Sequence, residues 1–148
     1  MQERIPVTDR KRDHSRTWQL WAGPAPAPLA EAHPHDDILM TGIDVTGSDG
    51  HAEGWAWGGP LPTESDPVQG GGSHTEDGRT EFVTLRFLDR LPTVHIETTR
   101  RTFTVDARAF PSHFGLKFWA QPMESGEEFV AAYVDPAQRP RLEDPALS

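Results

Sequence analysis

The sequence predicts an all-β protein, an antiparallel β-sandwich of six to eight short strands with long loops and extended terminal arms. Two observations carry this prediction. Between residues 81 and 135, apolar and polar side chains alternate with a period of two, which is typical of strands with one buried face. These segments are short, and turn-forming residues interrupt them every eight to twelve residues or so, as in sandwiches and small barrels.

The first 37 residues are predicted to form an N-terminal arm and a Pro-rich connector. Residues 1–16 are polar, and residues 22–30, AGPAPAPLA, favour an extended chain. Between them, TWQLW at 17–21 alternates as a short strand would. At the other end, residues 136–148 hold three prolines and are predicted to be a C-terminal tail.

The sandwich domain is predicted over residues 38–135. Its strands are expected at ILMTGIDV (38–45), HAEGWAWGG (51–59), EFVTLRFL (81–88), TVHIET (93–98), TFTVDA (102–107), FGLKFWA (114–120) and EEFVAAYVD (127–135). The first of these places Leu39, Thr41, Ile43 and Val45 on one face. A long Pro-, Gly- and polar-rich loop is expected at 58–80, and loops of that length are usually functional or mobile.

Charge and composition exclude several classes of protein. The net charge is −9, and residues 31–81 carry eleven acids against Arg79 alone, so the chain lacks the dense basic face of a duplex nucleic-acid binder. No run of about 18 apolar residues is long enough for a membrane-spanning helix, and the N-terminal residues do not read as a signal peptide. The chain has no cysteine, which excludes disulfides, thiolate metal sites and cysteine nucleophiles.

The densest cluster of metal-ligating residues is His33-Pro34-His35-Asp36-Asp37. Its His-x-His-x-Asp spacing, at His33, His35 and Asp37, resembles the ligand run of metallo-β-lactamase-type hydrolases. That motif needs a preceding strand and a much longer chain, whereas here the preceding residues are rich in proline. A solvent-facing polar loop is therefore the favoured interpretation, and a metal site bound by His33, His35 and Asp37 is the weaker alternative.

The chain is predicted not to be an enzyme and to need no cofactor. None of its serines lies in a G-x-S-x-G elbow, and the glycines at 70–72 lack the lysine of a phosphate-binding loop. Ser112 and His113 are neighbours in sequence, but adjacency alone does not make a hydrogen-bonded dyad.

Tryptophan is abundant, with Trp18, Trp21, Trp55, Trp57 and Trp119 in a chain of this length. Packing in the core or between subunits explains most such residues. A sharper hypothesis is a carbohydrate site, because indole faces stack on the apolar faces of pyranose rings. The residues predicted for that site are Arg108, His113, Trp119 and Gln121.

From about residue 42 the order of features resembles the H-type lectin domain. The similar segments are GWAW (54–57), EFVTLRFLDRLPTVHIETT (81–99), TFTVDARAFPSHFGLKFWA (102–120) and EEFVAAYVD (127–135). The resemblance implies a six-stranded antiparallel sandwich that assembles into trimers or hexamers, with sugar bound near subunit boundaries. Similar sandwiches also serve as structural or receptor-binding parts of bacteriophage tails and related particles. A weaker resemblance of DGHAEGWA (49–56) to small β-barrel cyclases provides an outside alternative.

These observations predict a non-enzymatic structural or receptor-binding component of a bacteriophage virion, tail or tail-like particle. The arms, the long loop and the tail favour it, because segments so poor in apolar residues rarely order without a partner. The alternative is a stand-alone H-type-lectin-like carbohydrate-binding protein. The expected partners are copies of the same chain in a homotrimer or homohexamer, other particle proteins and a cell-surface glycan, with no nucleic acid and no membrane insertion. The expected location is the virion or an extracellular particle, reached from the cytoplasm on assembly.

Overall fold

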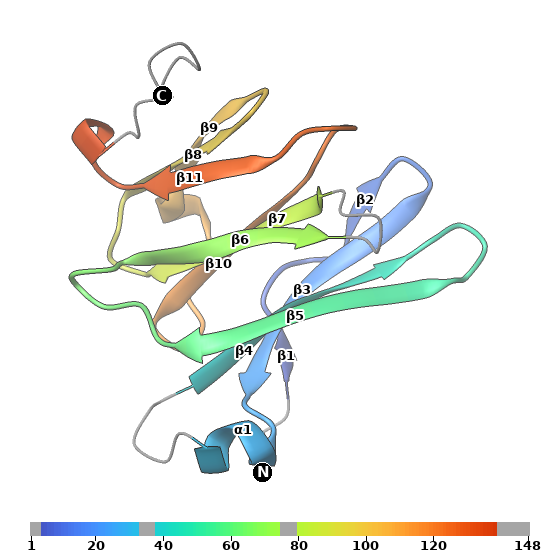
Figure 1. The fold of residues 1–148 in the computed structure, drawn as a ribbon, viewed down its shortest axis with the longest axis horizontal. Coiled ribbons are helices and arrows are strands. Elements are labelled where there is room, and N and C mark those ends of the chain that lie inside the picture. Colours follow the sequence, from blue (N-terminus) through green and yellow to red (C-terminus); the bar gives the residue numbers. More distant parts are fainter. Residues whose placement is uncertain (1–3, 33–37, 75–79, 139–148) are drawn as a thin grey trace.

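The chain folds into three stacked antiparallel sheets. The computed structural model describes residues 4–32, 38–74 and 80–138, and these residues form eleven strands and three short helices (Figure 1). Every strand pair is antiparallel. The predicted all-β sandwich is therefore confirmed, with more strands than the six to eight expected. No helix in the described residues has the length and apolar character needed to cross a membrane.

Sheet A contains the N-terminal strands. Its members are β1 (Ile5–Pro6), β2 (Lys11–Asp13), β3 (Arg16–Pro24), β4 (Ile38–Thr46) and β5 (Ala52–Pro60). β1 and β2 both pair with the same edge of β3, which is followed by β4 and β5. The short helix α1 (Ala27–Ala32) follows β3 in the chain.

Sheets B and C contain the remaining strands. Sheet B has the order β10 (Leu116–Pro122), β7 (Thr80–Leu88), β6 (Val68–His74), and sheet C has the order β11 (Phe129–Tyr133), β8 (Thr93–Thr98), β9 (Thr102–Asp106). Two 3-10 turns, η1 (Ala107–Ala109) and η2 (Pro136–Gln138), follow β9 and β11.

Sheet B is the middle layer and is buried on both faces. On β7, Phe82 packs against sheet A residues such as Leu20 and Ile43. The alternate residues of β7, Val83 and Leu85 among them, pack against the apolar side chains of sheet C. Because side chains alternate across a strand, the two cores lie on opposite sides of the same backbone. The predicted alternation of β7 is correct, and its second face is as buried as the first.

Arg86 is buried on the sheet A side of β7 and is fully enclosed. Its five N–H groups are matched by neutral acceptors, which are Gln69 Oε1, Thr41 Oγ1 and the carbonyl oxygens of Leu39, Gly59 and Pro60 at 2.5–3.2 Å. Its guanidinium also lies 4.4 Å from the ring centre of Trp57. Burial lowers the pKa of Arg86 to about 10, which still leaves it charged at neutral pH. This one side chain therefore ties β4, β5, β6 and β7 together.

A second buried charge, Glu127, joins the turns at one end of sheet C. Its carboxylate accepts hydrogen bonds from the Arg101 guanidinium (Nε at 2.8 Å), the Glu124 backbone N–H (2.9 Å) and the Thr98 hydroxyl. The Glu127 side chain is fully buried. The hydrogen bond from Arg101, helped by those from Glu124 and Thr98, lowers the pKa of Glu127 to about 2 against the effect of burial.

The N-terminal arm predicted for residues 1–37 differs from the structure. From Ile5 to Pro24 the chain lies in β1, β2 and β3, and Leu20 is completely buried. The loop predicted at 58–80 is likewise shorter than expected, because β5 continues to Pro60 and β6 begins at Val68. Isolated apolar residues in these polar stretches find their partners far along the chain, and a local pattern does not reveal such partners. Of the predicted tail, the structure describes only residues 136–138.

Candidate functional site

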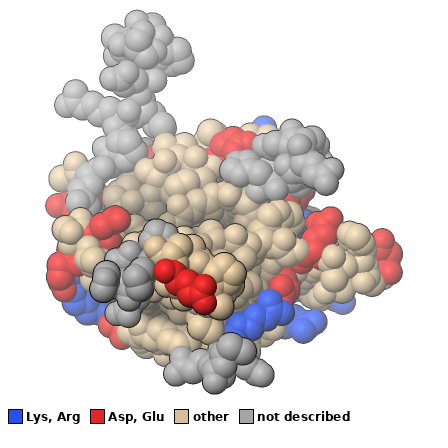
Figure 2. Space-filling model, turned by 60° about the horizontal axis from the view of Figure 1, so that its bottom comes forward, with Lys and Arg blue, Asp and Glu red and all other residues tan. Residues whose placement is uncertain are grey.

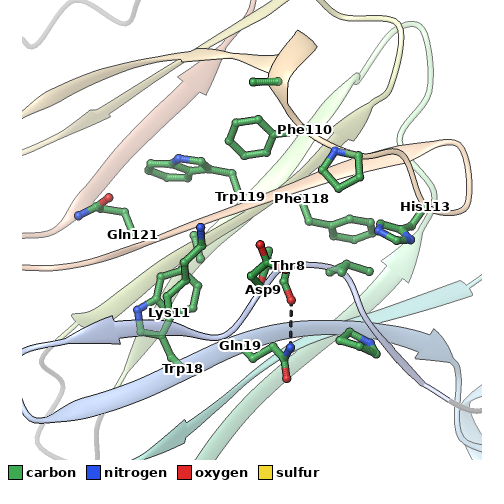
Figure 3. A pocket seen from close by; sticks show the side chains of 15 residues that line it. Thr8, Asp9, Lys11, Trp18, Gln19, Phe110, His113, Phe118, Trp119 and Gln121 are labelled. Atoms are coloured by element: carbon green, nitrogen blue, oxygen red, sulfur yellow. Dashed lines mark hydrogen bonds between the residues drawn. The ribbon is translucent and has the colours of Figure 1, made fainter.

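A cleft of about 770 Å³ separates sheet B from the N-terminal strands of sheet A (Figure 3). One wall is β10 with the segment that precedes it, and the other is the segment from β1 to β2 together with β3. The lining residues are Pro6, Val7, Thr8, Asp9, Lys11, Trp18, Gln19, Ala109, Phe110, Pro111, His113, Phe118, Trp119, Ala120 and Gln121. The volume lies within the range of about 300–1,000 Å³ that is usual for ligand sites.

A bulge in the edge strand of sheet A forms the N-terminal wall. Four residues, 7–10, separate β1 from β2, whereas only residues 19 and 20 separate their partners on β3. The two extra residues push Thr8 and Asp9 out of the ladder toward β10 (Figure 3). The Thr8 hydroxyl accepts from Leu20 N–H and the Thr8 carbonyl accepts from the Gln19 side-chain amide, both at 3.0 Å. These bonds hold the bulge in place.

The opposite wall combines an edge strand with a short folded segment. Among the described strands β10 pairs only with β7, and its other edge carries one isolated bridge, from Leu116 to His113. Phe118 belongs to the core between sheets A and B, and Trp119 belongs to the core between sheets B and C. This is expected because neighbouring residues of a strand point to opposite faces. Phe110 packs against the same core as Trp119. The Lys117 ammonium donates to Ala107 O at 2.5 Å, which fixes the start of this segment over β10.

Polar groups lie at both ends of the cleft and along its N-terminal wall. Lys11 and Gln121 are at one end and His113 is at the other (Figure 3). Between these ends, Thr8, Asp9 and Gln19 of the N-terminal wall lie opposite the apolar residues of the β10 wall (Figure 3). A cleft with a largely apolar wall and a few polar groups opposite it suits a ligand that is apolar on the side facing β10.

Three of the four residues predicted for a carbohydrate site line this cleft, namely His113, Trp119 and Gln121. Arg108 does not line it. Its guanidinium pairs with Asp106 (Nε to Oδ1, 3.0 Å), and Asp106 also accepts from the Arg108 backbone N–H at the start of η1. These bonds lower the pKa of the exposed Asp106 carboxyl.

Sequence reasoning did not find the N-terminal wall. Lys11, Trp18 and Gln19 lie about 100 residues before β10 in the sequence. Trp18 and Gln19 belong to β3, and the pairing of β2 with β3 places Lys11 beside them. The sole local signal was the alternation of TWQLW, which places Trp18 and Leu20 on one face and Gln19 on the other.

The cluster of His33, His35 and Asp37 lies outside the described residues, as does all of 33–37. Within the described ranges, no group of three or more His, Cys, Asp or Glu residues is placed to hold a metal ion. The Ser112 hydroxyl donates to the Asp89 carboxylate at 2.7 Å, and thus points to a carboxylate partner rather than to its neighbour His113.

Charged side chains in the view of Figure 2 are intermixed, with small separate groups of basic residues among acidic ones. Comparison of the chain with family models, curated proteins and solved structures finds no match. The resemblance to H-type lectin domains therefore stays a prediction, and function has to be inferred from the cleft itself.

Proposed function

We propose that this chain is a non-enzymatic binding component that recognises a partner molecule in the cleft beside β10. The observation that carries the proposal is the cleft itself, about 770 Å³ in volume, with a largely apolar wall along β10 and polar groups on the opposite wall and at both ends. Both walls are held by specific bonds, from Thr8 to β3 and from Lys117 to the segment before β10. A site built in advance in this way loses little entropy when a ligand enters.

Receptor binding within a bacteriophage tail or tail-like particle is the setting that we propose for this component. Its support is the resemblance of residues 42–135 to sandwiches found in such particles. The free arm that also favoured it contributes less, because residues 5–24 belong to sheet A.

A stand-alone lectin is supported less well by the geometry. Trp119 is only 9% exposed, and its ring packs 5.4 Å from that of Phe103. Trp18 is 6% exposed and packs edge-on against Phe82. A pyranose ring needs an open indole face, and neither residue presents one widely.

Filling the cleft tests the proposal. Ala109 is exposed and lines the cleft, so Ala109→Trp places a large ring in it. Ala52→Trp, at an exposed position on β5 away from the cleft, is the matched control. Screening of wild-type protein against a glycan array and a displayed peptide library is expected to yield a ligand that Ala52→Trp still binds and Ala109→Trp does not. If every ligand found binds Ala109→Trp as well as wild type, the cleft is not the binding site.

A further inference from the structure

The edge of β10 that faces the cleft presents unpaired backbone groups. The Met123 N–H donates to Glu81 O at 2.9 Å in the same register that pairs β10 with β7. Backbone groups of alternate residues point in opposite directions along an antiparallel strand, so the odd-numbered residues of β10 bond to β7. The N–H and C=O groups of Phe118 and Ala120 consequently point away from β7.

Both ends of this open edge are already hydrogen-bonded, and we call the unpaired stretch between them the window. Leu116 also points its backbone groups outward, but it exchanges two hydrogen bonds with His113, at 2.8 and 2.9 Å. At the other end the Pro122 carbonyl accepts from the Arg101 guanidinium at 3.0 Å. The open stretch therefore runs from Phe118 to Ala120.

The four outward groups of this window lack partners among the described residues, which supply no hydrogen bond to the outward N–H or C=O of Phe118 or Ala120. As whole residues Phe118 and Ala120 are only 2% and 8% exposed, and both line the cleft onto which these groups open. More than nine in ten buried backbone groups in proteins are paired, because an unpaired one costs about as much as a lost hydrogen bond. An unpaired stretch of strand edge of this kind can accept a further strand.

The walls of the cleft determine what kind of strand fits. A strand beside β10 would point its side chains alternately to the two faces of sheet B. On one face they would meet Val7 and Trp18, and on the other Phe110 and Trp119. Apolar side chains predominate on both sides, with Thr8 and Asp9 as polar neighbours on the sheet A side. Strands buried on both faces have continuous apolar runs rather than alternating ones.

We propose that the cleft binds an extended segment of a partner polypeptide, which adds to β10 as an extra strand through three consecutive apolar residues. This inference rests on the proposed function and names the class of its ligand. Phe118 and Ala120 each offer one N–H and one C=O, and the two residues lie about 6.6 Å apart along the strand. Alternate residues of a second strand have the same spacing. An antiparallel segment satisfies all four groups with two of its residues.

The segment comes from a partner, not from the undescribed parts of this chain. Residues 1–3, 33–37, 75–79 and 139–148 contain no run of three apolar residues that each carry a backbone N–H. The apolar runs elsewhere in the chain already lie in the strands of the two cores. A second copy could therefore donate a strand only by unfolding.

The test uses a displayed library of peptides with seven randomised positions between polar flanks, selected on the full chain. Ala120→Pro removes one outward N–H and keeps the ladder with β7, and proline is tolerated on edge strands at such positions. Ala120→Ser keeps the N–H and is the control. Thermal denaturation of both variants checks that the fold is intact.

We expect the selected peptides to contain three consecutive apolar residues and to bind Ala120→Pro at least about tenfold more weakly than Ala120→Ser. If Ala120→Pro does not fold, N-methylation of the apolar residues of a selected peptide removes the same bonds from the ligand side and should give a similar loss. Peptides that bind Ala120→Pro and their N-methylated forms unchanged would overturn strand addition. A glycan lost on Ala109→Trp but not on Ala120→Pro would also overturn it, while leaving the binding function of the cleft intact. If Ala109→Trp still binds every ligand as wild type does, both strand addition and ligand binding in the cleft are refuted.

Discussion

Replacement of Glu127 by glutamine is predicted to destabilise the protein in a way that depends on pH. The ordinary pKa of a glutamate is 4.5 and that of Glu127 is about 2. At 1.36 kcal/mol for each tenfold change, this difference corresponds to a stabilisation by ionised Glu127 on the order of 3 kcal/mol. Because the folded-state pKa is the lower one, the stabilisation is complete above pH 4.5 and is lost as the pH falls toward 2.

Urea denaturation of wild type and Glu127→Gln between pH 7 and pH 2.5 measures this effect. At pH 7 the free energy of unfolding of the variant is expected to be about 3 kcal/mol lower than that of wild type. This difference should narrow progressively below pH 4.5. Glu124→Gln is the control, because Glu124 is exposed and its carboxylate lies 3.8 Å from Arg101, so its loss should matter by less than about 1 kcal/mol. A gap that is the same at pH 3 as at pH 7 would refute the assignment of the low pKa to bonds made in the folded state.

Three further predictions concern stability and assembly. Arg86→Met should lower the free energy of unfolding by about 3–5 kcal/mol in chemical denaturation, because it leaves five buried acceptors without donors; a neutral effect would mean that water replaces the guanidinium. Phe114 has a φ of 57° in the turn before β10, so Phe114→Asn should raise the melting temperature by relieving about 1 kcal/mol of backbone strain, and a lower melting temperature would contradict this. Light scattering at micromolar concentration is expected to give a trimer or hexamer, since β5 leaves an exposed strand at the edge of sheet A; a monomer throughout would contradict the expected assembly.

The period of two in the sequence was enough to predict the strands of the second half. EFVTLRFL and TVHIET lie in β7 and β8, and FGLKFWA lies in β10 from Leu116 onward. Leu39, Ile43 and Val45 share the buried face of β4 as predicted. These segments are predictable because each buries one side against a neighbouring layer, and the side-chain pattern records that burial directly.

The layering could not be predicted, because alternation does not show that a polar face is buried. Arg86 stands where a solvent-facing residue would be expected, yet it is enclosed by acceptors from three other strands. The role of the N-terminal residues was missed for a related reason. Val7 ends the short apolar run Ile5-Pro6-Val7 between charged residues, and its burial depends on β3 rather than on its neighbours.

The candidate site was predictable only in part. His113, Trp119 and Gln121 lie within nine residues and reach the same cleft through one turn and one strand. Arg108 is as close in sequence but is held by Asp106. The unpaired edge of β10 depends on the hydrogen-bond register with β7 and on the bulge at Thr8, neither of which leaves a mark on local composition.

Amide hydrogen exchange along β10, followed by NMR on the full chain, tests most directly that this edge receives a strand. In the free protein, the Trp119 and Gln121 amides in the ladder with β7 should exchange slowly, and those of Phe118 and Ala120 at least about tenfold faster. Saturation with a selected apolar peptide should slow Phe118 and Ala120 to the rate of Trp119 and leave Trp119 unchanged. Exchange at Phe118 and Ala120 that is already as slow as at Trp119, or that does not respond to the bound peptide, would contradict strand addition at β10.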